Sequence, residues 1–333
     1  MTESNLLNVR GLSKSYALNT GLWSGAEGSV RAVDRVNFCI ERGRTFGLVG
    51  ESGSGKTTIG RMVLRVIEPD EGAILFSGAD SETVDLARLK PSQIRPLRHK
   101  IQMVFQDPYS SLDPRMTVAR IIGEPLAPIH GIARSEIQDR IVEATQLVGL
   151  RREYLDRYPH AFSGGQRQRI GIARALVSGP ELVVADEAVS ALDVSVQAQI
   201  LNLLRELQQK LGIAYLFIAH DLGVVRYLCD TIAVLYRGRI VEASEKRVLY
   251  QSPKHPYTES LIAAAPRPEP GVTTASYPQT IPTNEQLTTS AGCPYYSRCS
   301  YRQEICECQE PTLREIVPGQ FAACHFDLNL KGV

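Results

Sequence analysis

The stretch GESGSGKTT, residues 50–58, decides the fold of this chain. It follows the apolar run TFGLV at 45–49 and precedes a segment in which apolar residues recur at helical spacing up to Ile67. Its glycines allow the backbone to curl so that successive N–H groups face one concavity, which suits a phosphate group. Because the helix that follows directs its positive end at the same place, the stretch predicts a strand, a phosphate-binding loop and a helix.

The pattern G-x-x-x-x-G-K-[ST] is complete in this stretch, and its polar side chains have chemical tasks. Lys56 can reach the outer phosphates of a nucleotide, and the Thr57 hydroxyl can ligate Mg²⁺. The alternative is a glycine-rich loop with a solvated lysine, and the strand-to-helix context favours the nucleotide site. We therefore expect the nucleotide to contact Gly50, Ser52, Gly53, Gly55, Lys56, Thr57 and Thr58.

Composition and charge limit the class of protein. With 333 residues and 43% hydrophobic content, the chain can form two domains or one domain with a large appendage. A formal net charge of +1 gives no basic field for nucleic acid. No stretch reaches the roughly 18–20 apolar residues that span a bilayer, and the first residues lack a signal-peptide core, so we expect a soluble, cytosolic chain.

A second apolar run, residues 182–187, ends in two carboxylates. It is typical of a buried parallel strand, and ligands bind at the carboxyl edge of such sheets. Asp186 could therefore hold hydrated Mg²⁺, and Glu187 could polarise the attacking water. Taken alone, the run is equally compatible with two solvated acids in a loop.

The stretch FSGGQRQR, residues 162–169, is a second run of small residues at the start of a helical pattern. Its backbone N–H groups offer a second place for phosphate, although one nucleotide does not need two. The stretch resembles the signature L-S-G-G-Q of the ABC-family ATPases, with Phe162 in the first position. The resemblance implies a dimer in which each subunit completes the ATP site of the other through Ser163, Gly164, Gly165 and Gln166.

Further residues match the same family in the order of its motifs. Gln106 resembles the Q-loop glutamine, SALD at 190–193 resembles the D-loop, and His220 resembles the switch histidine. The resemblance implies that Gln106 ligates Mg²⁺ or orients water and that His220 hydrogen-bonds the γ-phosphate. Tyr16 matches the aromatic residue that stacks on adenine, with Trp23 as a competing aromatic.

The positions of these motifs imply an α/β fold, the ABC-type nucleotide-binding domain with a RecA-like core, an antiparallel β subdomain and a helical subdomain. Residues 1–45 alternate between apolar and polar, which favours antiparallel strands, and about 107–178 are expected to form the helical insert. The expected domains are an ATPase domain at 1–250, an extension and Pro-rich linker at 251–292, and a small cysteine-rich C-terminal domain at 293–333.

Five of the seven cysteines lie within residues 293–324. In a reducing compartment, clustered thiolates usually bind metal rather than pair with each other. The spacing C-x5-C-x6-C-x17-C lacks the knuckles of a zinc ribbon, and spacing alone leaves zinc and iron–sulfur open. Cys39 and Cys229 lie in apolar segments and are expected to be buried.

The C-terminal stretches HPYTESLIAAAP at 255–266, GCPYYSRC at 292–299 and ACHF at 323–326 resemble the extension of the dipeptide/oligopeptide permease ATPases. In that family four such cysteines hold a [4Fe–4S] cluster, which implies Cys293, Cys299, Cys306 and Cys324 as ligands, with Cys308 as a substitute for Cys306. Because every phosphate-binding residue precedes residue 221, ATP affinity is expected to be independent of these cysteines.

The whole resemblance implies the ATP-hydrolysing subunit of an ABC importer for di- or oligopeptides, with ATP, Mg²⁺ and a [4Fe–4S] cluster as cofactors and zinc as the alternative metal. The implied partners are a second, identical or homologous ATPase subunit, two membrane permease subunits and, indirectly, an extracytoplasmic binding protein. The chain would lie peripherally on the cytoplasmic face of the membrane.

Three alternatives remain open at this point. The first is an importer of the same subfamily for nickel, glutathione or a peptide-like antibiotic. The second is a soluble ABC ATPase acting on nucleic acid, which the near-neutral charge and the single set of motifs disfavour. In the third, the cysteine region senses redox state and regulates the ATPase.

Overall fold

The computed structural model describes residues 5–18, 28–79, 82–127, 129, 132–264, 291–328, 330 and 332. Trp23 and residues 265–290 of the expected linker lie outside these ranges. Contacts within the chain define two compact units. The first comprises Met1–Lys14, Arg35–Phe46 and Thr57–Ile218, and the second comprises Ser15–Asp34, Gly47–Lys56 and Ala219–Val333.

Parallel strands form the centre of the first unit. β7 (Leu182–Asp186) pairs with β6 (Ile101–Val104) on one side and with β8 (Ala214–Ala219) on the other, so that Val184 lies opposite Met103 and Leu216. Every residue of β7 and β8 is buried, as expected for strands covered on both faces. The prediction of a buried parallel strand within residues 182–187 is confirmed, and the strand ends at Asp186, one residue before Glu187.

An antiparallel sheet forms from N-terminal strands of the same unit. β1 (Asn5–Leu18) pairs with β4 (Glu71–Phe76), which pairs with the short β5 (Val84–Asp85). On β2 (Gly28–Glu41), the neighbours Phe38 and Ile40 are buried, so alternation turns Cys39 to the exposed face. The expectation that Cys39 is buried is therefore wrong, whereas Cys229 is fully buried.

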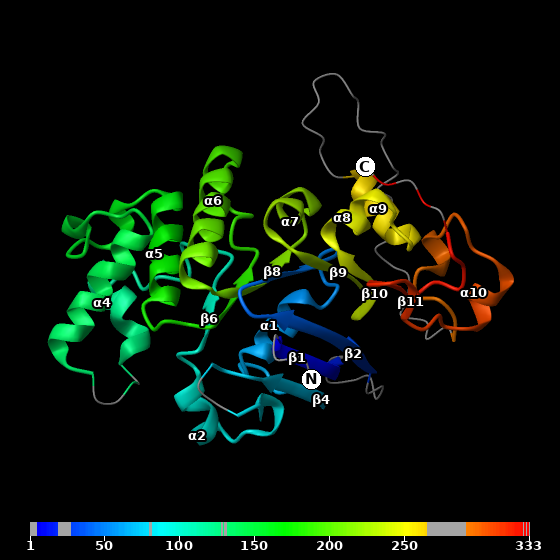
Figure 1. Cartoon of the computed structure of the whole chain (residues 1–333), viewed down its shortest axis with the longest axis horizontal. Helices are drawn as coiled ribbons and strands as arrows, with labels where there is room; N and C mark the ends of the chain where they lie inside the picture. Colours follow the sequence, from blue (N-terminus) through cyan, green and yellow to red (C-terminus); the bar gives the residue numbers. More distant parts are fainter. Residues whose placement is uncertain are drawn as a thin grey trace, which may run out of the picture. The chain divides into compact units, whose positions relative to one another are not determined.

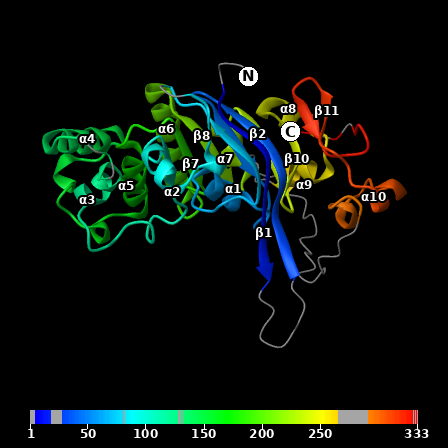
Figure 2. The ribbon, with the colours of Figure 1, turned by 90° about the horizontal axis from the view of Figure 1, so that it is seen from below.

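Three helices of the first unit lie together (Figures 1 and 2): α3 (Val118–Gly123), α4 (Arg134–Leu147) and α5 (Gly164–Leu176). Gly123 lets α3 approach α4 closely, because a Cβ there would lie 2.9 Å from Ile141 Cδ1. These helices fall within residues 107–178, so the predicted helical insert is confirmed. The unit also contains α2 (Pro91–Ile94) and α6 (Val194–Leu211).

The helix after the phosphate loop is shorter than its apolar spacing predicts. α1 spans Lys56–Val63 and does not continue to Ile67. Arg65 adopts a left-handed backbone with φ 54°, and the Val66 N–H turns back to the Arg61 carbonyl at 2.9 Å, which is a common way to end a helix. The strand before the loop is β3 (Thr45–Val49), as predicted.

Antiparallel strands and short helices form the second unit. β10 (Arg239–Glu245) pairs with β9 (Thr231–Tyr236) and with β12 (Gln320–Ala322), and β12 pairs with β11 (Arg314–Val317). The cysteine-rich region thus shares a sheet with residues 231–245. The described part of this unit contains the helices α7 (Leu222–Leu228), α8 (Lys246–Gln251), α9 (Pro256–Ala264) and α10 (Glu304–Cys308).

A buried carboxylate fixes the connection between these strands and α9. Glu242 accepts hydrogen bonds from the backbone N–H groups of Lys254 and His255, both at 2.8 Å, and from Gln320 Nε2 at 3.0 Å. Burial raises the pKa of Glu242.

Among the described residues, none of the helices combines the length and apolar character that a bilayer crossing needs.

Candidate nucleotide site and cysteine pocket

The phosphate loop of the second unit has the backbone that its glycines predict. Gly53 and Gly55 have φ angles of 77° and 105°, which L side chains rarely adopt. A Cβ on Gly55 would lie 2.3 Å from the Ala32 carbonyl oxygen, whereas no heavy atom lies within 4 Å of a Cβ on Gly53. At position 55, glycine is therefore required for two reasons, the backbone conformation and the close packing against Ala32.

Lys56 is the buried cation of this loop, with 4% of its surface exposed. Its Nζ donates hydrogen bonds to the carbonyl oxygens of Gly50 and Glu51, each at 2.8 Å. Burying an ammonium group is costly unless it is paired or hydrogen-bonded, so the loop holds a charge that favours an anion beside it. The phosphate chain of ATP fits this requirement.

In the first unit, Thr57 and Asp186 form a pair of oxygen donors. Thr57 Oγ1 donates to Asp186 Oδ1 at 3.1 Å, and Asp186 is 4% exposed at the end of β7. Mg²⁺ prefers oxygen ligands and usually takes one or two carboxylates together with phosphate oxygens. The donor set therefore fits the magnesium ion that accompanies ATP.

Glu187 and Gln106, predicted from separate motifs, lie side by side in the same unit. Gln106 Nε2 donates to Glu187 Oε2 at 2.8 Å. Glu187 has a φ of 47°, a conformation that costs a non-glycine residue about 1–3 kcal/mol. The Glu187 N–H donates to the Ile218 carbonyl at 2.9 Å, which fixes the strained residue at the edge of β8. The amide of Gln106 can thus orient the carboxylate.

The small-residue stretch predicted as the signature begins α5. Ser163 caps the helix: its Oγ accepts from the Gln166 N–H at 3.4 Å, and its own N–H donates to Gln166 Oε1 at 3.1 Å. A Cβ on Gly165 would lie 2.6 Å from Val196 Cγ1, so α6 requires glycine there. Phe162 is buried, and its ring makes an edge-to-face contact with Tyr154, with the ring centroids 5.4 Å apart. This contact explains an aromatic residue in the position that the signature gives to leucine.

Tyr16 and His220 belong to the second unit, and their roles, on adenine and on the γ-phosphate, stay predictions. Tyr16 is 40% exposed on β1, and His220 directly follows β8.

Gln168 is a residue of the first unit that the sequence patterns did not single out. Its buried Nε2 donates to the Ala188 carbonyl at 2.7 Å and fixes the chain just after Glu187. Its position in the repeated Q-R of the signature stretch was the available signal.

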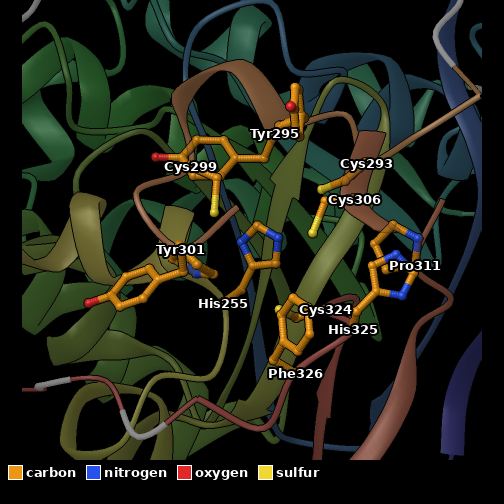
Figure 3. Close-up of a pocket in the computed structure, with 12 residues that line it drawn as sticks. His255, Cys293, Tyr295, Cys299, Tyr301, Cys306, Pro311, Cys324, His325 and Phe326 are labelled. Carbon is orange, nitrogen blue, oxygen red and sulfur yellow. The ribbon is translucent and has the colours of Figure 1, made fainter. Parts of the chain in front are cut away.

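The C-terminal cysteines line one pocket of the second unit (Figure 3). The side chains of Cys293, Cys299, Cys306 and Cys324 line one small pocket, with His255 and Tyr295 in its wall. Cys308 is exposed on α10 and is not among the lining residues. The geometry thus brings together the four cysteines that were predicted as a set.

The thiols of the pocket influence one another electrostatically. Burial, together with the nearby Cys306, Cys299 and Cys324, raises the pKa of Cys293 to about 11. Burial likewise raises the pKa values of Cys299 and Cys324. Four thiolates this close need a compensating positive charge, which a metal centre supplies. Burial also lowers the pKa of His255 to about 3, so its ring is neutral.

Three features define this chain as an ATP-hydrolysing domain of the ABC type. They are a glycine loop around a buried lysine, oxygen donors at the end of a parallel strand, and a capped helix start built from small residues. Comparisons with known proteins agree. Residues 33–190 match the family model described as ABC transporter, and 241–306 match that of the oligopeptide/dipeptide transporter C-terminal region.

Relatives match over almost the whole chain. A Brucella ovis protein named for peptide import and ATP binding is 48% identical over 325 residues, 97% of this chain and 98% of the relative. The Bacillus subtilis oligopeptide transport ATP-binding protein AppF is 43% identical over 332 residues, 98% of this chain and 99% of the relative.

Solved structures show the same fold. The dimeric ATP-binding cassette MJ0796 bound to ADP and Pi is 27% identical, with a TM-score of 0.62, over 72% of this chain and 99% of that one. The cassette cbiO1 of Clostridium perfringens is 28% identical, with a TM-score of 0.62, over 74% and 91%. The chain belongs to the ABC transporter ATPases of the oligopeptide/dipeptide family and is an ATPase that uses ATP with Mg²⁺.

Proposed function

We propose that this chain is the ATP-hydrolysing subunit that drives an ABC importer of di- or oligopeptides. The observation that carries the proposal is the near full-length similarity, at 43–48% identity, to proteins named for peptide import or oligopeptide transport. The match of 241–306 to the oligopeptide/dipeptide region favours this subfamily over soluble ABC ATPases acting on nucleic acid. The alternative solutes, nickel, glutathione or a peptide-like antibiotic, would be imported by a transporter of the same subfamily through the same ATPase subunit.

The residues of the site divide the work of hydrolysis. Lys56 and the N–H groups of the loop bind the phosphates, and Thr57 with Asp186 would hold Mg²⁺, which neutralises phosphate charge when bound. Glu187, oriented by Gln106, accepts a proton from the attacking water. The remaining assigned contacts are Tyr16 on adenine, His220 on the γ-phosphate and Gly50, Ser52, Gly53, Gly55 and Thr58 around the phosphates.

The signature stretch acts on the nucleotide of a second subunit. Ser163, Gly164, Gly165 and Gln166 present a capped helix start that suits phosphate, and the related cassette MJ0796 is dimeric. The dimer, of identical or homologous subunits, closes on ATP and reopens after hydrolysis, which moves two separate permease subunits between access states. A binding protein outside the membrane supplies the solute, and the ATPase lies peripherally on the cytoplasmic face.

The cysteine pocket holds a [4Fe–4S] cluster in this proposal. Cys293, Cys299, Cys306 and Cys324 supply the four thiolates that such a cluster needs. The described residues contain no set of three or more His, Cys, Asp or Glu side chains arranged around one metal ion. The choice of iron–sulfur over zinc therefore rests on the resemblance of the C-terminal stretches to the oligopeptide/dipeptide family. We keep 1–250, 251–292 and 293–333 as a proposed division along the sequence, in which β12 of the last part pairs with β10 of the first.

Purification of the tagged chain from membranes, with its partners identified by mass, tests the proposal. Permease subunits and a second ATPase subunit should accompany the wild-type chain. Ribosomal proteins or DNA in their place would overturn the proposal and favour a soluble ABC ATPase that acts on nucleic acid.

A further inference from the structure

A side chain of the cysteine-rich region contacts the phosphate loop within the second unit. Arg298 lies one residue before Cys299, and its guanidinium makes a bidentate pair with Glu51, the second residue of GESGSGKTT. Nη1 donates to Oε2 at 3.0 Å and Nη2 donates to Oε1 at 2.8 Å. Paired parallel hydrogen bonds of this kind are the strongest and most directional form of an arginine–carboxylate contact.

The backbone of Glu51 is held as well. Its N–H donates to the hydroxyl of Tyr257 at 2.9 Å, and its carbonyl accepts from Lys56 Nζ at 2.8 Å. Tyr257 is fully buried on α9. Two groups from the C-terminal extension therefore fix the residue whose carbonyl positions the phosphate-binding lysine.

Arg298 is held in turn by aromatic rings that reach the cysteine pocket. Its guanidinium lies 5.9 Å from the ring centroid of Tyr236 and 5.6 Å from that of Tyr295. Tyr295 packs against Tyr257 at 5.5 Å and against His255 at 5.6 Å, and both Tyr295 and His255 line the pocket (Figure 3). The position of Arg298 therefore depends on the fold of the segment between Cys293 and Cys299.

The charge of Glu51 gives this contact a consequence. A carboxylate in a phosphate-binding loop opposes an anionic ligand, and because the Glu51 side chain is 37% exposed, water screens only part of this opposition. A bidentate arginine both neutralises the carboxylate and holds it in place. The loop can then present Lys56 and its N–H groups without a competing negative charge.

We propose that Arg298 is a positioning residue for the nucleotide site, through which the cysteine-rich region raises the affinity of the phosphate loop for ATP. The inference rests on the proposed function, because it takes ATP as the ligand of the loop. It differs from the expectation, drawn from sequence position, that ATP affinity is independent of the cysteine-rich region.

Binding of a fluorescent ATP analogue to the full-length chain, purified without oxygen, tests the inference. Arg298→Ala should weaken binding by about three- to tenfold, because it removes a bidentate pair whose two side chains are 36% and 37% exposed. The matched control is Arg302→Ala, since Arg302 has the same charge in the same region but stacks on Tyr296 instead. Adding Glu51→Gln to Arg298→Ala should restore most of the affinity, because the unpaired carboxylate is gone.

The rescue separates positioning from a merely structural role, since a misfolded region would not recover when Glu51 loses its charge. Arg298→Ala that binds as tightly as Arg302→Ala would overturn the inference. So would a double variant as weak as Arg298→Ala. Lys56→Ala identifies failure of the proposed function itself: if it binds the analogue as wild type does, ATP is not the ligand of the loop, whereas failure of the inference alone leaves Lys56→Ala weak.

Discussion

Gly55→Ala is expected to destabilise the chain more than Gly53→Ala. Both glycines have positive φ angles, 105° and 77°, which cost an alanine about 1–3 kcal/mol. Only at position 55 would the new Cβ also lie 2.3 Å from a carbonyl oxygen, that of Ala32, and such overpacking costs about 1–3 kcal/mol more. We therefore expect a loss of about 2–6 kcal/mol for Gly55→Ala and about 1–3 kcal/mol for Gly53→Ala.

Denaturant unfolding of both full-length variants, followed by far-ultraviolet circular dichroism without nucleotide, measures the difference. The two substitutions match in chemistry and in loop, so wild type and Gly53→Ala serve as references. A Gly55→Ala chain that loses no more stability than Gly53→Ala would refute the close packing of the loop against Ala32.

Other expected outcomes concern the chemistry of the site. In the assembled complex, Glu187→Gln should bind ATP but stop its hydrolysis, because the residue that accepts the proton from water is lost. Lys56→Ala should weaken ATP binding itself. Measurements of nucleotide binding and of phosphate release distinguish the two variants. A Ser163→Arg chain mixed with Lys56→Ala should regain part of the ATPase activity, since one intact shared site can form, and activity proportional to wild-type subunits alone would contradict this. Protein purified without oxygen should contain about four irons and four sulfides per chain. Cys306→Ser should lose them and Cys308→Ser should retain them; stoichiometric zinc without sulfide would contradict the cluster.

Sequence patterns predicted the strands and helix starts that carry the candidate nucleotide site, because its residues sit at the ends of regular elements. A buried β-strand has few alternatives for an apolar run such as 182–186, and the carboxylates that end it necessarily reach the sheet edge. The pairing of Gln106 with Glu187 follows from adjacent parallel strands. The end of α1 could not be predicted, because the left-handed turn at Arg65 is a choice of backbone that apolar spacing does not record.

Contacts between distant segments were outside the reach of sequence patterns. The pair of Arg298 with Glu51 joins residues 247 positions apart, and although Glu51 lies in GESGSGKTT and Arg298 in GCPYYSRC, neither stretch predicts the pairing. The four cysteines were predicted as a set by resemblance, but the choice between Cys306 and Cys308 depends on which face of a short helix meets the pocket. Burial distinguishes them in the structure, since Cys306 is buried and Cys308 is exposed.

Peptide uptake by the reconstituted complex tests most directly whether ATP hydrolysis by this chain drives import. The complex of this chain with its permease partners would be placed in vesicles with ATP enclosed, and a labelled oligopeptide with its binding protein would be added outside. We expect uptake and ATP consumption with the wild-type chain and neither with Glu187→Gln. Peptide uptake that continues unchanged when Glu187→Gln has stopped hydrolysis, or hydrolysis by the wild type with no uptake of any peptide, would contradict the proposed function.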